Sequence, residues 1–385
     1  METVYLDNAA TTQIDDEVIS AMHESMRSNF GNPSSTHAFG RKAKAAVETA
    51  RKSIASLLNV SPSNIVFTSG GTEADNMAIS CAVRDLGVTR IISSRIEHHA
   101  VLNCLEFLDA EHKIDLQFVN LDENGSVDLA HLEQLLAENP TAKTLVSLMH
   151  INNEIGNILD IKAVGELCQK HKAYFHSDTV QSVGHYEMNL SEIPVDFIAV
   201  SAHKFHGPKG VGFLYVKSRS HLKPFIHGGS QERELRAGTE SVHNIVGMQR
   251  ALELACSNLK EESKYIKSLK KHFMTSLKAE IPGIRFNGLS GDLENSTYTL
   301  VNVSIPLSVS ESDMMLFQLD LKGIACSKGS ACQSGAQLGS FVLNEVYGEK
   351  LDYPGIRFSF SKFTTPKELD YVISTLKSLA LSEAN

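Results

Sequence analysis

Short apolar runs alternate with amphipathic helical patterns through the first two thirds of the chain, and this rhythm limits the fold more than any other feature. The runs indicate buried strands at residues 65–67, 90–93, 116–119, 144–148, 173–178, 196–201 and 211–215. Helical patterns begin at residue 72 and also cover residues 101–110 and 161–171. The alternation predicts a largely parallel sheet with helices on both faces. Ligand-binding side chains are then expected at the carboxyl ends of the strands.

The rhythm changes in the last third of the chain. One long helical pattern, with at most one break, covers residues 244–280. It is followed by a strand at 299–304, a helix at 312–321, a Gly/Ser-rich loop, a strand at 355–360 and a last helix from Pro366. We therefore expect a large α/β domain over residues 15–255 and a smaller α+β domain formed by residues 1–14 and 256–385.

Composition narrows the class of protein. With 385 residues, of which 42% are hydrophobic, the chain can bury one large core and a second, smaller one. Its formal charge of -9 argues against binding to nucleic acid, which normally requires a basic surface. No stretch approaches the roughly 18 apolar residues of a membrane span, and no signal-like apolar core begins the chain, so we expect a cytoplasmic protein without membrane contact. The six cysteines include no Cys-x-x-Cys pair, which disfavours a zinc site or a disulfide framework.

Two of the predicted strands end in polar residues that suit one cofactor. The run that ends at Ser201 is followed by Lys204, which stands between two histidines, and the run that ends at Asp178 is followed by Gln181. Pyridoxal 5'-phosphate (PLP) is held by a lysine as a Schiff base, and a buried carboxylate keeps its ring nitrogen protonated. Taken alone, a lysine can simply cap a strand and an aspartate can bond a turn. Together, the residues predict PLP chemistry.

Eight motifs extend this interpretation along the whole chain. They are YLDNAATT (5–12), GNPSSTH (31–37), TSGGTEADN (68–76), EHHA (97–100), MHINNEIG (149–156), SAHKFHGPKG (201–210), LRAGTE (235–240) and GSAC (329–332). In this order they resemble the cysteine desulfurases, PLP enzymes of the class V aminotransferase family. The resemblance implies the type I fold of PLP-dependent transferases, with a mostly parallel, seven-stranded type of sheet, and a homodimer that acts on L-cysteine.

A glycine turn is the candidate phosphate site. Residues 69–72 lie between a predicted strand and helix, where glycines let the backbone approach an anion and the first-turn amides point at it. The spacing fits neither Gly-x-Gly-x-x-Gly nor a Walker loop, so on these residues alone the turn could equally be structural. The resemblance implies that Thr239 reaches the phosphate from the other subunit. It assigns four further phosphate ligands: Gly71, Thr72, Ser201 and His203.

The resemblance also assigns the residues around the cofactor ring. His98 would stack on the ring and shuttle protons at neutral pH, although a lone histidine is more often a packing residue. Asp178 would pair with the ring nitrogen and Gln181 would bond the phenolic oxygen. A metal site could also be built from four histidines: His98, His99, His176 and His203. Their spacing matches no known ligand set, so we expect no metal.

Two residues are expected to bind the substrate. Asn153 resembles the family residue that contacts both the ring oxygen and the substrate carboxylate. Arg357 resembles the arginine that binds the carboxylate of the amino acid, and the fork of a guanidinium can bond both carboxylate oxygens at once. The alternative for Arg357 is an ordinary surface ion pair.

Cys332 decides which reaction of the family is expected. It lies in a Gly- and Ser-rich segment, residues 327–336, for which the sequence predicts an exposed, mobile loop. A thiolate on such a loop can attack a bound substrate and then leave it. The loop resembles the longer kind found in the group that serves iron-sulfur assembly, which implies a sulfur-acceptor protein such as an iron-sulfur scaffold as partner. Cys326 is interpreted as structural.

The catalytic residues expected from the resemblance are Lys204, Cys332 and His98. L-Cysteine would displace Lys204 from the cofactor, the amine of Lys204 would remove the alpha proton, and Cys332 would take the sulfur as a persulfide while L-alanine leaves. Two alternatives stay open at this point. One is a selenocysteine lyase, which depends less on the cysteine, and the other is a noncatalytic binding module that kept the fold.

Overall fold

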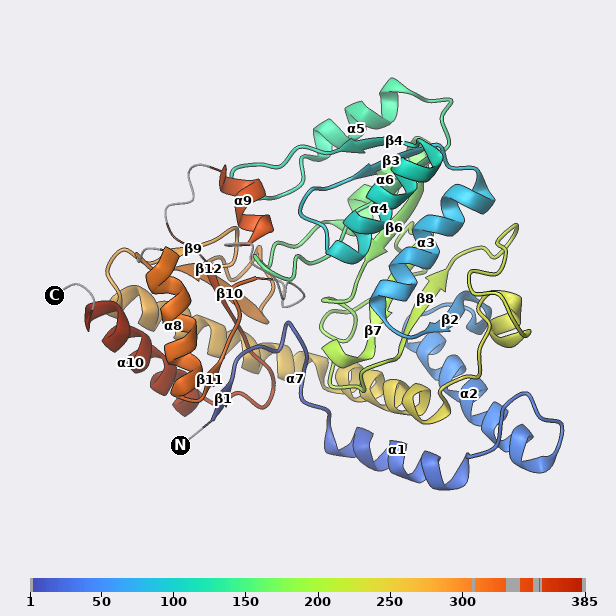
Figure 1. Cartoon of the computed structure of the whole chain (residues 1–385), viewed down its shortest axis with the longest axis horizontal. Helices are drawn as coiled ribbons and strands as arrows, with labels where there is room; N and C mark the ends of the chain where they lie inside the picture. The colour runs from blue at the N-terminus through green and yellow to red at the C-terminus, as the bar shows by residue number, and fades with distance from the viewer. Residues whose placement is uncertain (1–2, 307–308, 330–339, 349–352, 354, 383–385) are drawn as a thin grey trace.

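The computed structural model describes residues 3–306, 309–329, 340–348, 353 and 355–382 (Figure 1). A seven-stranded sheet lies at the centre of the larger part, in the order β2-β8-β7-β6-β5-β3-β4. The predicted strand boundaries are correct to within one residue. The strands are β2 (Ile65–Thr68), β3 (Arg90–Ser93), β4 (Asp115–Phe118), β5 (Thr144–Ser147), β6 (Tyr174–Asp178), β7 (Phe197–Ser201) and β8 (Gly212–Val216).

Neighbouring strands of this sheet run parallel except at β8. This strand is antiparallel to both β2 and β7. The connection from β7 to β8, residues 202–211, is too short for the helical crossover that a parallel pair requires. The prediction of a largely parallel sheet is confirmed, and the short connection explains the one exception among these seven strands.

Helices cover both faces of the sheet, as predicted. Successive strand residues point to opposite faces, so Ile198 and Val200 of β7 pack with α2, α6 and the first part of α7, whereas Phe197 and Ala199 pack with α3. Helix α4 packs beside α3 and extends the same helical layer over the sheet. The helices of this part are α1 (Asp16–Ser28), α2 (Ala38–Leu57), α3 (Gly71–Leu86), α4 (His99–His112), α5 (Leu129–Glu138), α6 (Ile161–Lys170) and α7 (Val242–Glu280).

The smaller part confirms the predicted α+β character. An antiparallel sheet in the order β12-β10-β9 lies near the parallel pair β1-β11, and helices pack against them (Figure 1). No helix in the described part of the chain is long and apolar enough to span a membrane. The elements of this part are β1 (Val4–Tyr5), β9 (Arg285–Phe286), β10 (Leu300–Ser304), α8 (Val309–Leu321), β11 (Ile324–Ala325), α9 (Phe341–Tyr347), β12 (Gly355–Ser359) and α10 (Pro366–Ser382).

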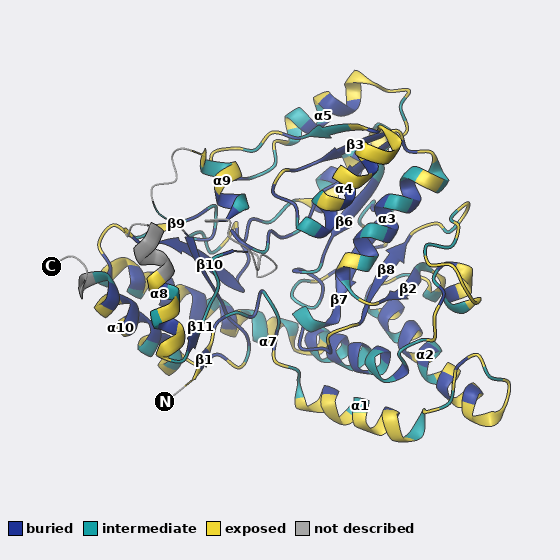
Figure 2. Ribbon diagram, in the orientation of Figure 1, coloured by how far each residue is buried: buried dark blue, intermediate teal, exposed yellow. Residues whose placement is uncertain are grey.

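Helix α7 joins two separate cores. It is one continuous helix of 39 residues, without the break that the sequence allowed. Its buried residues up to Ala255 belong to the core of the large sheet, and those from Ile266 belong to the smaller core, which also holds Val4 and Leu6. Figure 2 shows both groups of buried residues. The division after residue 255 stays a prediction, and the separation of the cores supports it.

Candidate active site

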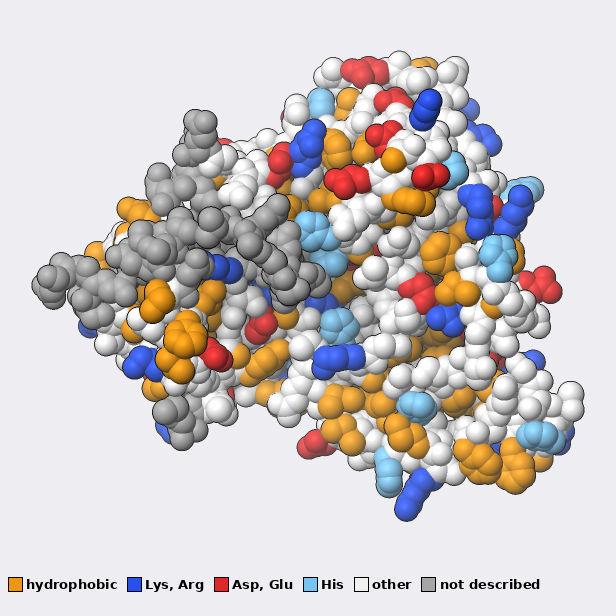
Figure 3. All heavy atoms as spheres, in the orientation of Figure 1, with side chains coloured by type: hydrophobic (Ala, Val, Ile, Leu, Met, Phe, Trp, Pro, Cys, Tyr) orange, Lys and Arg blue, Asp and Glu red, His pale blue; other side chains and the backbone are white. Residues whose placement is uncertain are grey.

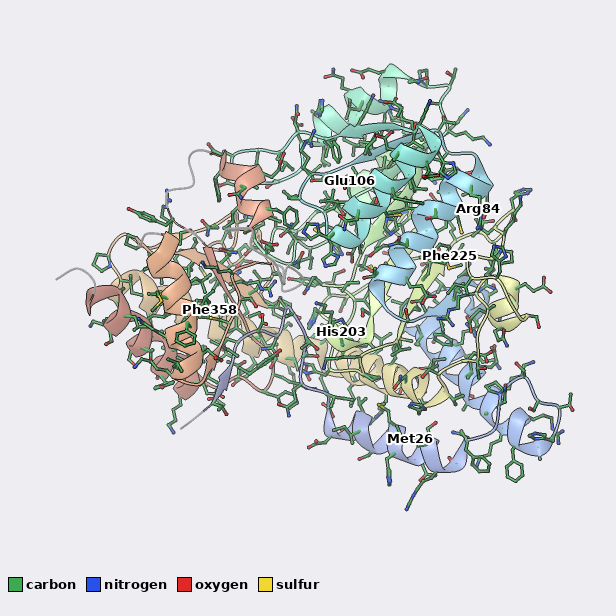
Figure 4. The ribbon with its side chains drawn as sticks, in the orientation of Figure 1. Met26, Arg84, Glu106, His203, Phe225 and Phe358 are labelled. Atoms are coloured by element: carbon green, nitrogen blue, oxygen red, sulfur yellow. The ribbon has the colours of Figure 1, made fainter. Side chains whose placement is uncertain are left out.

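A cavity lies at the carboxyl ends of β5, β6 and β7, where the two parts meet. The space inside its lining, including the part that is open to solvent, is about 770 Å³. Figure 4 labels His203, one of its lining residues, near the middle of the molecule. The structure brings together ten of the predicted site residues in the lining of this cavity: Gly71, Thr72, His98, Asn153, Asp178, Gln181, Ser201, His203, Lys204 and Arg357.

Lys204 stands at the end of a short 3-10 turn, Ala202–Lys204, directly after β7. Its Nζ donates hydrogen bonds to the backbone oxygens of Ala9 (2.7 Å) and Ala10 (2.8 Å). His185 holds the lysine backbone from the other side, with Nε2 at 2.9 Å from the carbonyl oxygen of Lys204. The amine is therefore fixed inside the cavity, within reach of a ligand that enters it.

Asp178 ends β6 and is buried, as a partner for a ring nitrogen should be. Its Oδ1 accepts a hydrogen bond from the backbone N–H of Val180 at 2.9 Å. Burial, reinforced by the nearby carboxyl of Asp75, raises the pKa of Asp178 to about 7. A buried carboxylate is unfavourable as an anion unless a cation lies beside it. Asp178 therefore suits a protonated pyridine ring, because the ring would supply that positive charge.

His98 is the N-cap residue of α4, and this position selects its tautomer. Its Nδ1 accepts a hydrogen bond from the backbone N–H of Ala100 at 3.1 Å, so the hydrogen of the neutral ring resides on Nε2. Burial, with a further contribution from the charge of Lys204, lowers the pKa of His98 below its ordinary 6.5. The ring is thus neutral at pH 7 and keeps one N–H for the cavity. The next residue, His99, packs instead on Phe341, with ring centroids 4.4 Å apart.

The beginning of α3 lies at the edge of the same cavity, where its Gly71 and Thr72 are part of the lining. No side chain caps this helix, which leaves its first-turn amides available to a phosphate. The chain turns into it at Gly70, whose φ of 154° favours glycine. A Cβ at Gly71 would lie 2.7 Å from Cγ2 of Val180, so this close approach also requires glycine. Ser201 and His203 line the cavity beside the turn.

Arg357 lies on β12 and is only 1% exposed, which excludes the surface ion pair considered above. Its Nη1 donates to the backbone oxygen of Asn153 at 2.8 Å, and its Nη2 contacts Oδ1 of Asp7 at 3.0 Å. Nε is buried and has no hydrogen-bond partner in the described part of the chain. Gln181, which also lines the cavity, donates from Nε2 to the backbone oxygen of Ala9 at 2.9 Å.

Two predicted site residues are not in this lining. Thr239 is exposed on the loop that follows residues 231–234, outside the cavity of its own chain. Cys332 lies outside the described residues. The described Cys326 makes a poor nucleophile, since burial raises the pKa of its thiol to about 12. The structural interpretation of Cys326 agrees with that environment.

Two acidic residues of the site were missed in the sequence. Asp75 lines the cavity from α3, with Oδ1 at 3.3 Å from Nε2 of the buried His176. Burial raises the pKa of Asp75 well above its usual range. The available signal was the helical spacing, because Asp75 follows Thr72 by three residues and shares its helix face. The other acid, Asp7, is in the YLDNAATT motif, but no local pattern reveals its partner Arg357.

The residues that are present fit PLP. They offer a lysine amine, a buried carboxylate, a histidine ring and an uncapped helix N-terminus in one cavity. A metal centre finds no such support, since the described residues contain no group of three His, Cys, Asp or Glu that could hold an ion.

Comparison with known proteins identifies the family. The family model for class V aminotransferases matches residues 4–372, and the chain belongs to this family. The cysteine desulfurase IscS of Dictyoglomus turgidum is 40% identical over 380 residues, which cover 98% of this chain and 94% of that protein. The IscS of Vibrio cholerae is 40% identical over 382 residues, or 97% of this chain and 92% of that protein. The resemblance to the cysteine desulfurases is thereby confirmed.

Solved structures agree with this assignment. A NifS-like protein superposes with a TM-score of 0.89 at 34% identity and covers 98% of this chain and 99% of its own. The protein SspA, solved in complex with cysteine, reaches a TM-score of 0.80 at 30% identity over 94% of this chain and all of its own. The predicted fold class, a type I PLP-dependent transferase fold, is confirmed.

Proposed function

We propose that this chain is a PLP-dependent cysteine desulfurase that converts L-cysteine to L-alanine and leaves the sulfur as a persulfide on Cys332. The observation that carries the proposal is the single cavity in which Lys204, Asp178, His98 and Arg357 meet. The reaction balances without another reagent. The carbon-sulfur bond of the substrate breaks, a sulfur-sulfur bond to Cys332 forms, and the thiol proton of the enzyme ends on alanine.

The polar residues named above have defined tasks in this proposal. When bound, PLP supplies an electron sink for the negative charge that develops at the substrate Cα. Lys204 holds the cofactor and later takes the alpha proton on its Nζ. Asp178 stabilises positive charge on the ring nitrogen, and His98 passes protons at Nε2. The uncapped start of α3 binds the phosphate.

Substrate binding follows from the same geometry. Arg357 is a buried cation in the lining of the cavity, and it is expected to receive the α-carboxylate of the amino acid. Asn153, which accepts from Nη1 of Arg357 through its backbone, keeps its side-chain amide for the ligand. Gln181 is expected to bond the phenolic oxygen of the cofactor.

The test is the release of L-alanine and sulfide from L-cysteine in the presence of a thiol. We expect Lys204→Ala to lose more than roughly a hundredfold in turnover, since it removes both the attachment and the general base. Cys332→Ser should bind substrate but form no persulfide. Full turnover with L-cysteine by Cys332→Ser would contradict the sulfur-transfer step. Preference for L-selenocysteine in that variant would point to a selenocysteine lyase, and a colourless, inert wild type after addition of PLP would point to a binding module.

The assembly belongs to the proposal as well. We infer a homodimer in which Thr239 of one chain reaches the phosphate of the other, which is supported by the exposure of Thr239 outside its own cavity. The persulfide would pass to a sulfur-acceptor protein, such as an iron-sulfur scaffold. A cytoplasmic location suits this chemistry, because the described cysteines are free thiols and a reducing compartment keeps thiols reduced.

A further inference from the structure

We propose that Asp7 is a positioning residue that presents Arg357 to the cavity and limits how tightly the site holds an amino-acid carboxylate. This inference rests on the proposed function, in which Arg357 binds that carboxylate. Asp7 itself would touch neither cofactor nor substrate. It acts by accepting a hydrogen bond from the guanidinium of Arg357 and by compensating the positive charge of that group.

The contact between the two residues joins distant parts of the chain. Oδ1 of Asp7 lies 3.0 Å from Nη2 of Arg357, in a buried environment on the arginine side. Nη1 is already used by the backbone oxygen of Asn153, while the buried Nε has no partner in the described part of the chain. The guanidinium is therefore fixed at two nitrogens, and the donors that these contacts do not use are the buried Nε and a second hydrogen on Nη2.

Asp7 cannot leave this position easily, because the segment that carries it is anchored to β12. Asn8 donates from Nδ2 to the backbone oxygen of Ser359 at 2.8 Å, and the backbone N–H of Ala9 donates to Oγ of Ser359 at 2.8 Å. Leu6 is fully buried in the smaller core. The same segment also accepts the hydrogen bonds of Lys204, so moving it would disturb the lysine as well.

The charges of Asp7 and Arg357 determine how Asp7 affects the binding of a carboxylate ligand. The pair of the partly buried Asp7 and the buried Arg357 is nearly neutral, so a ligand carboxylate that joins it brings a second negative charge to one guanidinium. Two carboxylates so close repel each other in a medium less polar than water. Substrate and product carry the same α-carboxylate, and the repulsion therefore weakens both. Weak binding of the product favours its release, which is the gain that this arrangement offers.

The test is the variant Asp7→Asn, which keeps an acceptor oxygen for Nη2 of Arg357 and removes the negative charge. L-Alanine is titrated into the PLP-loaded enzyme, and binding is followed by the absorbance of the cofactor. We expect the dissociation constant of L-alanine to fall roughly tenfold, with a parallel fall in KM for L-cysteine and no rise in kcat. The matched control is Asp15→Asn, which breaks a comparable pair with Lys362 (2.7 Å) outside the lining of this cavity. It should leave the alanine affinity unchanged.

A double variant separates positioning from a general structural effect. In the Arg357→Gln background, Asp7→Asn should change the alanine affinity by less than roughly twofold, because the charge acts through the guanidinium. If Asp7→Asn bound alanine as weakly as the wild type or more weakly, with the thermal midpoint of the wild type, the role inferred for Asp7 would be wrong. The proposed function would not be affected by that result. If Arg357→Gln bound alanine as tightly as the wild type, the proposed carboxylate site itself would fail.

Discussion

The side chains of the cavity owe their chemistry chiefly to burial. Burial raises the pKa of Asp178 to about 7 and that of Asp75 well above its usual range, while it lowers the pKa of His98. Neighbouring charges then modify these shifts, as Asp75 does for Asp178 and Lys204 does for His98. A cationic ring next to Asp178 would reverse the largest of these costs. Cofactor binding and the protonation of these groups should therefore depend on each other.

His98 allows a test of proton transfer at the level of one residue. His98→Gln keeps an acceptor for the Ala100 N–H and a donor for the cavity but cannot change its charge. We expect kcat to fall by roughly 10² to 10³ while the affinity for PLP changes by only a few fold. The wild-type pKa lies below 6.5, so the neutral ring persists at pH 7 and is lost as the pH falls.

The matching measurement is the pH profile of kcat/KM for L-cysteine. Protonation at Nδ1 breaks the bond with Ala100 and places a second cation near Lys204, so activity of the wild type should decline on the acid side of pH 6.5. His98→Gln should lack this acid limb. If both proteins lost activity in the same way at low pH, another group would be responsible. That result would contradict proton transfer by His98.

How far individual site residues could be predicted depends on where their partners lie. Lys204 and Asp178 directly follow buried strands, so the parallel sheet alone brings them to one edge. The pair of Asp7 and Arg357 joins residues 350 positions apart, one just after β1 and the other on β12, and no periodicity encodes such a contact. The role of Asp75 depends on His176 across the helix–sheet interface. These contacts arise only in the folded molecule.

At the scale of elements, the strands of the large sheet were the most predictable, because their apolar runs are short and bounded by polar residues. The sequence did not assign α1, α2 or α5. It also could not orient β8, whose direction follows from the length of one connection. The conformation of the loop before α7 could not be predicted from the sequence either. Residues 232–234 there adopt positive φ angles of 45°, 56° and 69°, which side chains other than glycine rarely take.

A buried ion pair holds this loop in its unusual conformation. Glu232 receives two hydrogen bonds of 2.8 Å from Arg51 of α2, and it accepts a third of 2.8 Å from the backbone N–H of Phe67. Both side chains are almost fully buried. Such strain persists only where the surroundings over-determine the conformation. The pair therefore fixes the loop that leads to Thr239.

Glu232→Gln tests this role of the ion pair. The variant removes the buried counter-charge of Arg51 and leaves its guanidinium with only the partly exposed carboxylate of Glu48, which lies 3.0 Å from Nε. Breaking a buried ion pair costs about 3–5 kcal/mol of unfolding free energy, and we expect a loss near the lower end of that range. Urea unfolding of the PLP-free protein measures this loss. If the loop places Thr239 at the phosphate of the partner subunit, PLP affinity should fall as well. Arg233→Gln is the control, because its pair with Glu48 (3.5 Å) is partly exposed and should cost less than about 1 kcal/mol. Equal stability of Glu232→Gln and the control would contradict the proposed constraint.

At the scale of the whole molecule, the site exists because two cores meet. The large sheet supplies Lys204 and Asp178, the β12 sheet supplies Arg357, and the amino-terminal segment contacts both. α7 contributes to both cores and connects them. A rotation of one part against the other would separate Lys204 and Asp178 from Arg357. The continuous α7 and the anchored segment both oppose such a movement.

The exposed apolar surface near α1 and α2 tests the proposed homodimer. Phe30 and Phe39 are 69% and 57% exposed, and their ring centroids lie 5.1 Å apart at the corner between these helices. Figure 3 shows further apolar side chains along the face that α1 forms. A lone soluble chain seldom keeps a large apolar patch in water, so a second copy is the expected cover.

Phe30→Glu combined with Phe39→Glu should weaken the dimer, since association would have to bury two unpaired carboxylates in place of two aromatic rings. We expect the dimer dissociation constant to rise by at least roughly a hundredfold, as measured by sedimentation equilibrium. Phe107→Glu is the matched control, because this phenylalanine is 61% exposed on α4, far from the corner of α1 and α2 (Figure 1). PLP affinity should fall together with dimerisation if Thr239 completes the site of the partner. If the double variant remained as dimeric as the control, the interface would lie elsewhere. If the wild type sedimented as a monomer at every concentration, Thr239 could not belong to the cofactor site of a partner subunit.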